Sequence, residues 1–189
     1  MRVDFKKTKF VLSALTPSDR PKDGLPEILI VGRSNVGKSS LINALCGAKL
    51  AFPSKKAGKT KLLNFFLVDS RFYLVDSPGY GSTGFATMST INFASMMESY
   101  HGVPSLKGIV YLVDLRRELG KDDLSFLAYL KGFGVGLLPV LTKADTYNQS
   151  QAHLARKRAL EAGLGDILFS DLTPESLTRI RAGIAKFIS

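Results

Sequence analysis

The sequence predicts an α/β fold in which a mostly parallel, six-stranded sheet is covered by helices on both faces. Two observations predict it. Apolar runs of strand length alternate along the chain with stretches of helical periodicity, which is typical of parallel sheets built from strand–helix–strand units. In addition, 45% of the 189 residues are hydrophobic, which is enough to fill one core. We therefore expect residues 1–189 to form a single domain.

Each element is placed by its local pattern. Strands are expected in buried apolar runs, near residues 27–31, 62–68, 71–76, 107–113, 137–142 and 166–169. Helices are expected where apolar residues recur three or four positions apart, at about residues 38–46, 87–100, 122–132, 150–162 and 174–188. The apolar run at 10–15 is too short for the core of a signal peptide, and no stretch is long enough to span a membrane.

A phosphate-binding loop follows the first of these strands. Residues 32–39 read Gly-Arg-Ser-Asn-Val-Gly-Lys-Ser, a complete GxxxxGK[ST] pattern between a strand and a helix. Gly32 and Gly37 let successive N–H groups curl around phosphate oxygens, and the following helix points its positive dipole end at them. Lys38 adds a charge near the β- and γ-phosphates, and the Ser39 hydroxyl can ligate Mg²⁺. The loop predicts binding of a nucleoside triphosphate.

A second motif, Thr142-Lys143-Ala144-Asp145, indicates that the base is guanine. The Asp145 carboxylate can accept hydrogen bonds from N1–H and the 2-amino group of guanine, a donor pair that adenine lacks, and the stem of Lys143 can cover the base. A site that leaves a buried polar group unpaired can reject the wrong ligand by about 10⁴-fold, so Asp145 alone can select guanine. The alternative is an Asp that only caps a helix.

Two further segments can serve Mg²⁺ and the γ-phosphate. Asp76-Ser77-Pro78-Gly79 closes a strand, so that Asp76 can hold Mg²⁺, usually through water, and the Gly79 N–H can approach the phosphate because glycine has no side chain in the way. Thr60 ends the polar segment at 55–60 and can reach the metal and phosphate only while GTP is bound. The alternatives are a simple Ser-Pro-Gly turn and a solvated loop hydroxyl.

With these motifs in place, the chain resembles the EngB (YihA/YsxC) family of bacterial GTPases, relatives of the Era and TrmE groups that act in assembly of the large ribosomal subunit. The likeness runs through nearly the whole chain. The matching segments are Phe10-Val11, Ser13-Ala14, Gly24-Leu25-Pro26-Glu27-Ile28, Gly32 to Leu45, Asn64-Phe65-Phe66, Asp76, Pro78-Gly79-Tyr80-Gly81, Leu106-Lys107-Gly108, Val113-Asp114, Arg116 and Thr142 to Asp145. Ser82-Thr83-Gly84 reads as an insertion relative to the family pattern.

The resemblance implies a three-layer P-loop GTPase fold and a last guanine-binding loop at Phe169-Ser170, which offers a backbone N–H to the base oxygen. In TrmE-type relatives the position of Asn35 helps to ligate a potassium ion against the phosphates; the alternative is an Asn that bonds only its own loop.

Motifs and resemblance together give one expected site. Its catalytic residues are Asn35, Lys38, Thr60 and Gly79; its Mg²⁺ ligands are Ser39, Thr60 and Asp76; its GTP- or GDP-binding residues are Gly32, Arg33, Ser34, Asn35, Val36, Gly37, Lys38, Ser39, Ser40, Gly58, Lys59, Thr60, Asp76, Ser77, Pro78, Gly79, Thr142, Lys143, Ala144, Asp145, Phe169, Ser170 and Asp171.

Tyr80 bears on the rate of hydrolysis. It stands directly after the DxxG pattern, where Ras-like enzymes carry a water-orienting Gln, so we expect slow hydrolysis by a nucleotide switch. A GTP-dependent binding module with negligible hydrolysis is the alternative. A small-molecule P-loop kinase is a third possibility, against which the Thr142–Asp145 motif speaks.

The net charge of +10 indicates a polyanionic partner. Basic residues gather at 49–61, at 156–158 and at 179–186. Ribosomal RNA of the large subunit is what the resemblance implies, without specificity for DNA; an anionic membrane surface and ordinary solvated faces are the alternatives. The one cysteine, Cys46, is expected in the core, and we expect a cytoplasmic monomer.

Overall fold

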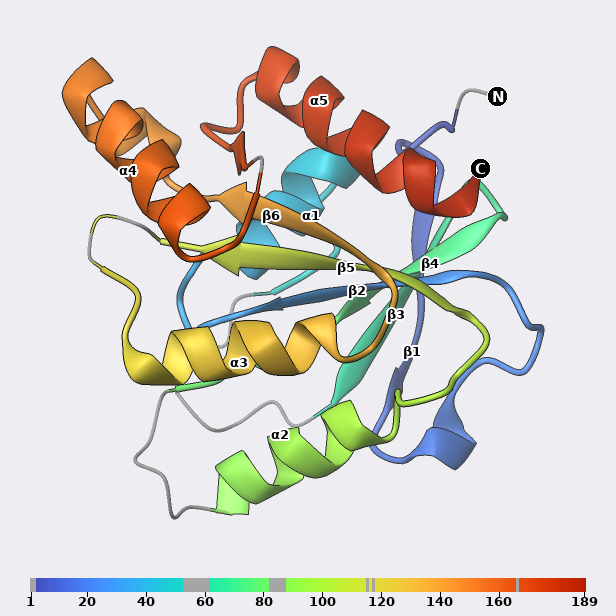
Figure 1. Cartoon of the computed structure of the whole chain (residues 1–189). Coiled ribbons are helices and arrows are strands. Elements are labelled where there is room, and N and C mark those ends of the chain that lie inside the picture. Colours follow the sequence, from blue (N-terminus) through green and yellow to red (C-terminus); the bar gives the residue numbers. More distant parts are fainter. Residues whose placement is uncertain (1–2, 53–61, 82–87, 115, 117, 166) are drawn as a thin grey trace.

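The computed structural model describes residues 3–52, 62–81, 88–114, 116, 118–165 and 167–189, without the side chains of 88–92. These residues form a seven-stranded sheet in the order β1-β3-β4-β2-β5-β6-β7, with helices on both faces (Figure 1). The pairs β2–β4, β2–β5, β5–β6 and β6–β7 are parallel, whereas β1–β3 and β3–β4 are antiparallel. The predicted three-layer α/β fold class is confirmed.

The elements lie close to their predicted positions. The strands are β1 (Thr8–Ala14), β2 (Glu27–Gly32), β3 (Leu63–Val68), β4 (Phe72–Asp76), β5 (Leu106–Val113), β6 (Gly136–Leu141) and β7 (Leu168–Phe169). The α-helices are α1 (Lys38–Cys46), α2 (Met88–Glu98), α3 (Lys121–Lys131), α4 (Gln149–Glu161) and α5 (Pro174–Ala185). Short 3-10 turns lie at Pro17–Asp19, Ala144–Thr146 and Lys186–Ile188, so the last predicted helix is α-helical only as far as Ala185.

The predicted count of six strands was wrong, because β1 adds a seventh among the described residues. It runs antiparallel to β3, with Thr8 opposite Val68 and Ala14 opposite Leu63. As an edge strand it buries little, and Phe10 and Val11 remain 49% and 39% exposed. A strand paired on one side only needs no continuous buried apolar run, so the pattern that marked the other strands is absent here.

Two apolar clusters sandwich the sheet and fix the central strand β2. Ile28 and Ile30 face a cluster that includes Leu41, Ile42 and Leu45 of α1 and Leu177, Ile180 and Ile184 of α5. Leu29 and Val31 face the opposite cluster, which includes buried residues of α2, α3 and α4. All four β2 side chains are fully buried, as the apolar run predicts for a strand covered on both faces. The loop at the carboxyl end of β2 therefore follows a strand that is buried on both faces.

Candidate nucleotide-binding site

The predicted motifs meet at one edge of the sheet. Pairing of Ile30 with Asp76, Gly32 with Leu112 and Val113 with Leu141 brings the carboxyl ends of β2, β4, β5 and β6 together. In open α/β sheets this edge is where ligands bind. The tertiary structure thus gathers residues that lie more than one hundred positions apart in sequence.

The phosphate-binding loop depends on its glycines. A Cβ on Gly32 would lie 2.8 Å from Val36 Cγ1 and 3.0 Å from the Leu112 carbonyl oxygen, so a side chain does not fit. Gly37, with φ of 110°, stands directly before α1, where a left-handed backbone favours glycine. Asn35 also has a positive φ, of 62°, and is exposed. Ser39 is half-buried in the first turn of α1, next to the exposed Ser40.

Lys38 and Asp76 form a buried pair of opposite charge beside the loop. The Lys38 Nζ donates long hydrogen bonds to the Gly32 carbonyl (3.4 Å) and the Arg33 carbonyl (3.5 Å). Burial raises the pKa of Asp76 to about 6, although the charge of Lys38 acts to lower it. Burial likewise lowers the pKa of Lys38, against the effect of Asp76. Burial thus disfavours the charged form of both side chains. A bound anion near Lys38 or a bound cation near Asp76 would stabilise that charged form.

One carboxylate oxygen of Asp76, Oδ1, is buried without a hydrogen bond to the described residues. Leaving a buried charged oxygen unpaired is costly, so this position suits a cation or a metal-bound water. The neighbouring Ser77 has another role, because its hydroxyl donates to the Ile30 carbonyl at 2.7 Å and fastens the strand end to β2.

Gly79 packs directly against the phosphate-binding loop. A Cβ at this position would lie 2.6 Å from Ser34 Cα and 2.7 Å from Ser34 N, so only glycine allows this approach. The next residue continues the contact: the Ser34 N–H donates to the Tyr80 carbonyl (3.0 Å) and the Tyr80 N–H donates to the Gly32 carbonyl (3.3 Å). The segment that includes the half-buried Pro78 is thereby joined to the loop.

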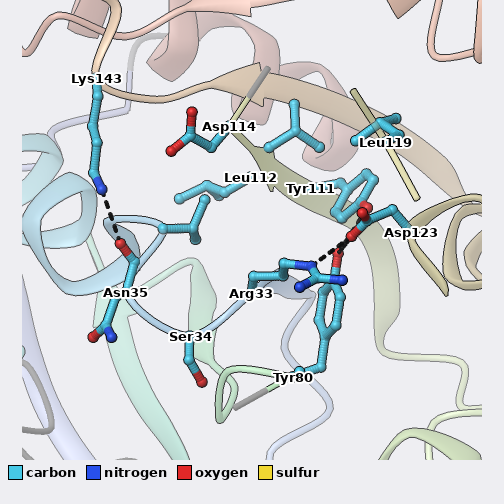
Figure 2. A pocket seen from close by; sticks show the side chains of 13 residues that line it. Arg33, Ser34, Asn35, Tyr80, Tyr111, Leu112, Asp114, Leu119, Asp123 and Lys143 are labelled. Atoms are coloured by element: carbon cyan, nitrogen blue, oxygen red, sulfur yellow. Dashed lines mark hydrogen bonds and ion pairs between the residues drawn. The ribbon is translucent and has the colours of Figure 1, made fainter. Parts of the chain in front are cut away.

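The predicted guanine motif is fastened to the same loop. The Thr142 hydroxyl donates to the Val36 carbonyl at 2.6 Å. The Lys143 Nζ donates to the Asn35 carbonyl at 3.2 Å, a bond drawn in Figure 2. Asp145 is exposed in the 3-10 turn Ala144–Thr146. It does not cap α4, because Asn148 does so by accepting from the Gln151 N–H. The helix-cap alternative for Asp145 is thus excluded.

The last predicted loop lies beside this motif. The Ala144 N–H donates to the Ser170 carbonyl (3.0 Å), and the Ser170 N–H donates to the Leu141 carbonyl (2.8 Å). Ser170 is buried, and its Oγ has no hydrogen bond within the described residues. The Arg156 guanidinium lies 4.3 Å from the centre of the Phe169 ring.

Asp171 is turned toward the start of α5. Its carboxylate accepts hydrogen bonds from the N–H (3.0 Å) and hydroxyl (2.7 Å) of Thr173, which caps that helix. Hydrogen bonds with Ser176 and Thr173 lower the pKa of Asp171 to about 2. Gly58, Lys59 and Thr60 lie outside the described residues, as do the lysines at 55, 56 and 61 and the segment 82–84.

Sequence reasoning missed a cavity of about 270 Å³ that opens beside the loop. Its polar lining includes Arg33, Asn35, Tyr80, Asp114, Asp123 and Lys143. Asp114, at the end of β5, pairs with Arg116. Asp123 lies in the first turn of α3 and is separated from Arg33, its partner, by 90 residues. Its position after Gly120 is typical of a helix start, which gave no signal for a long-range contact.

Comparison with known proteins identifies the family. Residues 27–143, more than half of the chain, match the family described as 50S ribosome-binding GTPase. The chain is 39% identical over 195 residues to a probable GTP-binding protein EngB of Geobacillus kaustophilus, covering 99% of this chain and all of that one. This chain belongs to the EngB family of GTP-binding proteins. The resemblance inferred from the motifs is confirmed.

Other EngB proteins extend the likeness. A probable GTP-binding protein EngB of Lactobacillus helveticus is 43% identical over 155 residues, which cover 81% of this chain and 79% of that protein. The crystal structure of a probable GTP-binding protein engB superposes with a TM-score of 0.64 at 18% identity, covering 86% of this chain and 98% of that one. That superposition supports the fold.

None of the helices formed by the described residues is long and apolar enough to cross a membrane.

Proposed function

We propose that this EngB protein binds GTP with Mg²⁺ at the carboxyl edge of the sheet, hydrolyses it slowly and acts as a nucleotide switch in assembly of the large ribosomal subunit. The observation that carries the proposal is the buried Asp76 carboxylate, which lies beside Lys38 and the phosphate-binding loop with one oxygen unpaired within the described residues. That arrangement is costly in the protein alone and becomes favourable when a phosphate-bound cation completes it.

The loop provides the phosphate contacts. Backbone N–H groups of residues 35–40 would surround the phosphates at the start of α1. The Lys38 ammonium would exchange its long bonds to the Gly32 and Arg33 carbonyls for stronger bonds to phosphate oxygens. Burial lowers the pKa of Lys38, and the negative charge of a phosphate in this position would raise it again.

The metal site is supported by the Asp76 oxygen that is unpaired within the described residues and by Ser39, which follows Lys38 in the first turn of α1. Hard divalent cations prefer such carboxylate, hydroxyl and water oxygens. Ser39 and Asp76 would hold Mg²⁺, with Thr60 completing the set in the GTP state. When bound, Mg²⁺ neutralises negative charge on the phosphates.

Guanine would be held between loops that the structure has already joined. Asp145 is exposed and so available to N1–H and the 2-amino group. The Lys143 Nζ is bonded to the Asn35 carbonyl, and the Lys143 stem would cover the base. The Ser170 carbonyl accepts from the Ala144 N–H, and the Ser170 N–H is already donated to the Leu141 carbonyl. A donor to the base oxygen would therefore be another N–H of this segment. We infer GTP specificity from this arrangement.

Slow hydrolysis follows from the environment of Tyr80. Its hydroxyl lies 2.8 Å from the Tyr111 hydroxyl and donates to Asp123 Oδ1 at 3.3 Å. A side chain engaged in this way is not free to orient water, so unaided turnover on the order of 10⁻⁴ to 10⁻² s⁻¹ is expected. The same observation favours the second candidate, a GTP-dependent binding module with negligible hydrolysis.

The partner is inferred from charge and family. A net charge of +10 suits a polyanion, and the matched family is described as 50S ribosome-binding. We propose that residues 1–189 act as one GTPase domain, as a cytoplasmic monomer that docks on large-subunit particles in its GTP form. Hydrolysis then weakens docking.

Cosedimentation with ribosomal particles tests this directly. The protein is spun with large and small subunits in GTP, in GDP and without nucleotide, and bound protein is measured. Binding to large subunits that is strongest in GTP supports the switch. Equal binding in all three conditions, or none to large subunits, would contradict it. Single-turnover release of phosphate from bound GTP then separates the slow enzyme from the binding module.

A further inference from the structure

Arg33 and Asp123 form a largely buried ion pair behind the phosphate-binding loop. Figure 2 shows the contact, in which the Arg33 Nε donates to Asp123 Oδ1 at 2.7 Å. Asp123 is only 2% exposed. The other carboxylate oxygen accepts from the Gly120 N–H at 3.0 Å, which fixes it at the start of α3. The second residue of the loop is thereby anchored to a helix on one face of the sheet.

Tyr80 joins the same network. Its hydroxyl reaches both Asp123 Oδ1 and the Tyr111 hydroxyl, and its ring packs against Phe126 with centroids 4.3 Å apart. Burial raises the pKa of Tyr80, so this hydroxyl stays neutral and acts as a hydrogen-bonding group. The Tyr80 side chain is therefore held by β5 and α3.

The backbone of Tyr80 is held by the phosphate-binding loop. It forms a parallel bridge with Arg33, through its N–H to the Gly32 carbonyl and its carbonyl to the Ser34 N–H. Gly79 is consequently pressed against Ser34, where no side chain fits. Gly79 is thus linked through Tyr80 to the Arg33–Asp123 pair.

The Arg33 guanidinium points toward Asp123 and away from the Asn35–Lys143 contact on the other side of the loop (Figure 2). It also lines the approach to Gly81, whose Cβ would lie 3.4 Å from Arg33 Nη1. The guanidinium is thus held to Asp123 through Nε. We therefore expect Arg33 to act on hydrolysis through the residues that it holds and not by contact with phosphate.

We propose that Arg33 and Asp123 are positioning residues for GTP hydrolysis, which hold Tyr80 and thereby set the Gly79 N–H for the γ-phosphate. The inference rests on the proposed GTPase function. GDP has no γ-phosphate, so the pair affects GTP hydrolysis and GTP affinity but leaves GDP affinity nearly unchanged. A misplacement of about 1 Å can cost about 100-fold in rate, so a large effect needs only a small displacement of Gly79.

The test compares Asp123→Asn, Arg33→Met and the double variant with the unaltered protein. Single-turnover hydrolysis of GTP, affinity for a fluorescent GDP and thermal unfolding are measured for each. Each single variant is expected to hydrolyse GTP about 10- to 100-fold more slowly, with GDP affinity within about 2-fold. The double variant should be no slower than the slower single variant, because two residues that act as a unit are not additive.

Two further variants keep the test decisive. Tyr80→Phe removes only the hydroxyl and should slow hydrolysis less than Asp123→Asn does. Glu175→Gln disrupts the exposed pair between Glu175 and Arg179 in α5 and serves as the matched control, with no expected change. Folding is verified by GDP binding in every variant.

The outcomes separate the inference from the function on which it rests. If the unaltered protein neither binds nor hydrolyses GTP, the proposed function is wrong. If it hydrolyses GTP and Asp123→Asn does so equally fast, the positioning role is overturned. A loss with Arg33→Met but not with Asp123→Asn also overturns it, because that pattern is expected of an arginine that contacts phosphate itself.

Discussion

The Lys143 ammonium donates a hydrogen bond to the Asn35 carbonyl oxygen across 3.2 Å, and this contact joins the predicted guanine motif to the phosphate-binding loop. The two residues lie 108 positions apart. Thr142 makes a second bond of the same kind, to the Val36 carbonyl. The parts proposed to hold the base and the phosphates are therefore fixed relative to each other before a ligand binds.

Asp145→Asn should exchange the preferred base. The carboxylate is expected to accept from N1–H and the 2-amino group of guanine, whereas an amide can donate to the carbonyl at position 2 of xanthine. GTP affinity should fall by about 10²-fold or more, and xanthosine triphosphate should bind more tightly to the variant than GTP does. Competition against a fluorescent GDP measures both, with the exposed Asp122→Asn as the control. Equal affinity of the unaltered protein for ATP and GTP would refute the assignment.

Asp76→Asn should stabilise the nucleotide-free protein at neutral pH. The folded protein raises the pKa of Asp76 from 3.8 to about 6, so it favours the protonated form. The folded state therefore gains stability from protonated Asp76. This contribution to the free energy of unfolding is fully present below pH 3.8 and is lost as the pH rises through about 6. The variant, neutral at every pH, should be more stable than the unaltered protein at pH 7.5 by about 1–3 kcal/mol, with a gap that shrinks at pH 4.5. Lys38 loses its counter-charge in the variant, which keeps the gain at the low end.

Urea unfolding at the two pH values measures this gap. With GTP and Mg²⁺ the order should reverse, because the variant lacks the oxygen proposed to support the metal. A gap that is the same at pH 4.5 and 7.5 would show that the Asp76 charge is not what burial penalises. Unchanged Mg²⁺ dependence of GTP binding in the variant would remove Asp76 from the metal site.

The affinity for large ribosomal subunits should fall steeply with salt. Each neutralised RNA phosphate adds about 0.7 to 0.9 to the slope of log K against log[salt]. Replacing the lysines at 55, 56 and 59 with Glu should flatten the slope. The same number of charge reversals at Arg156, Lys157 and Arg158 tests α4 as a second candidate surface. A slope unchanged by the first set and flattened by the second would move the contact to α4.

Potassium should accelerate GTP hydrolysis more than sodium at equal ionic strength. Asn35 is exposed on the phosphate-binding loop, so its side chain is accessible to an ion. Its backbone carbonyl accepts a hydrogen bond from Lys143. A cage of carbonyl oxygens can distinguish ions by size and field. Asn35→Ala should abolish the difference between the two ions. Equal rates for the unaltered protein in potassium and sodium chloride would end the potassium hypothesis and leave GTP hydrolysis untouched.

Features of this EngB protein that depend on residues close together in the chain were predictable from the sequence. The bounds of α1 were predicted correctly at 38–46, because Gly37 before it and Gly47 after it adopt left-handed backbone that favours glycine. The strands buried on both faces were found because a covered strand must be apolar throughout. The phosphate-binding loop and the Thr142–Asp145 motif were recognised because their spacing along the chain is itself the signal.

The folded structure was needed to show which distant groups share charge and hydrogen bonds. It placed β1 at the sheet edge, where partial burial removed the sequence signal, and it paired Arg33 with Asp123 and Tyr80 with Tyr111. It also showed that Asn148, and not Asp145, caps α4. These contacts depend on which strand ends and helix starts lie close together after the core has packed. The residue types alone do not indicate which of them will be neighbours.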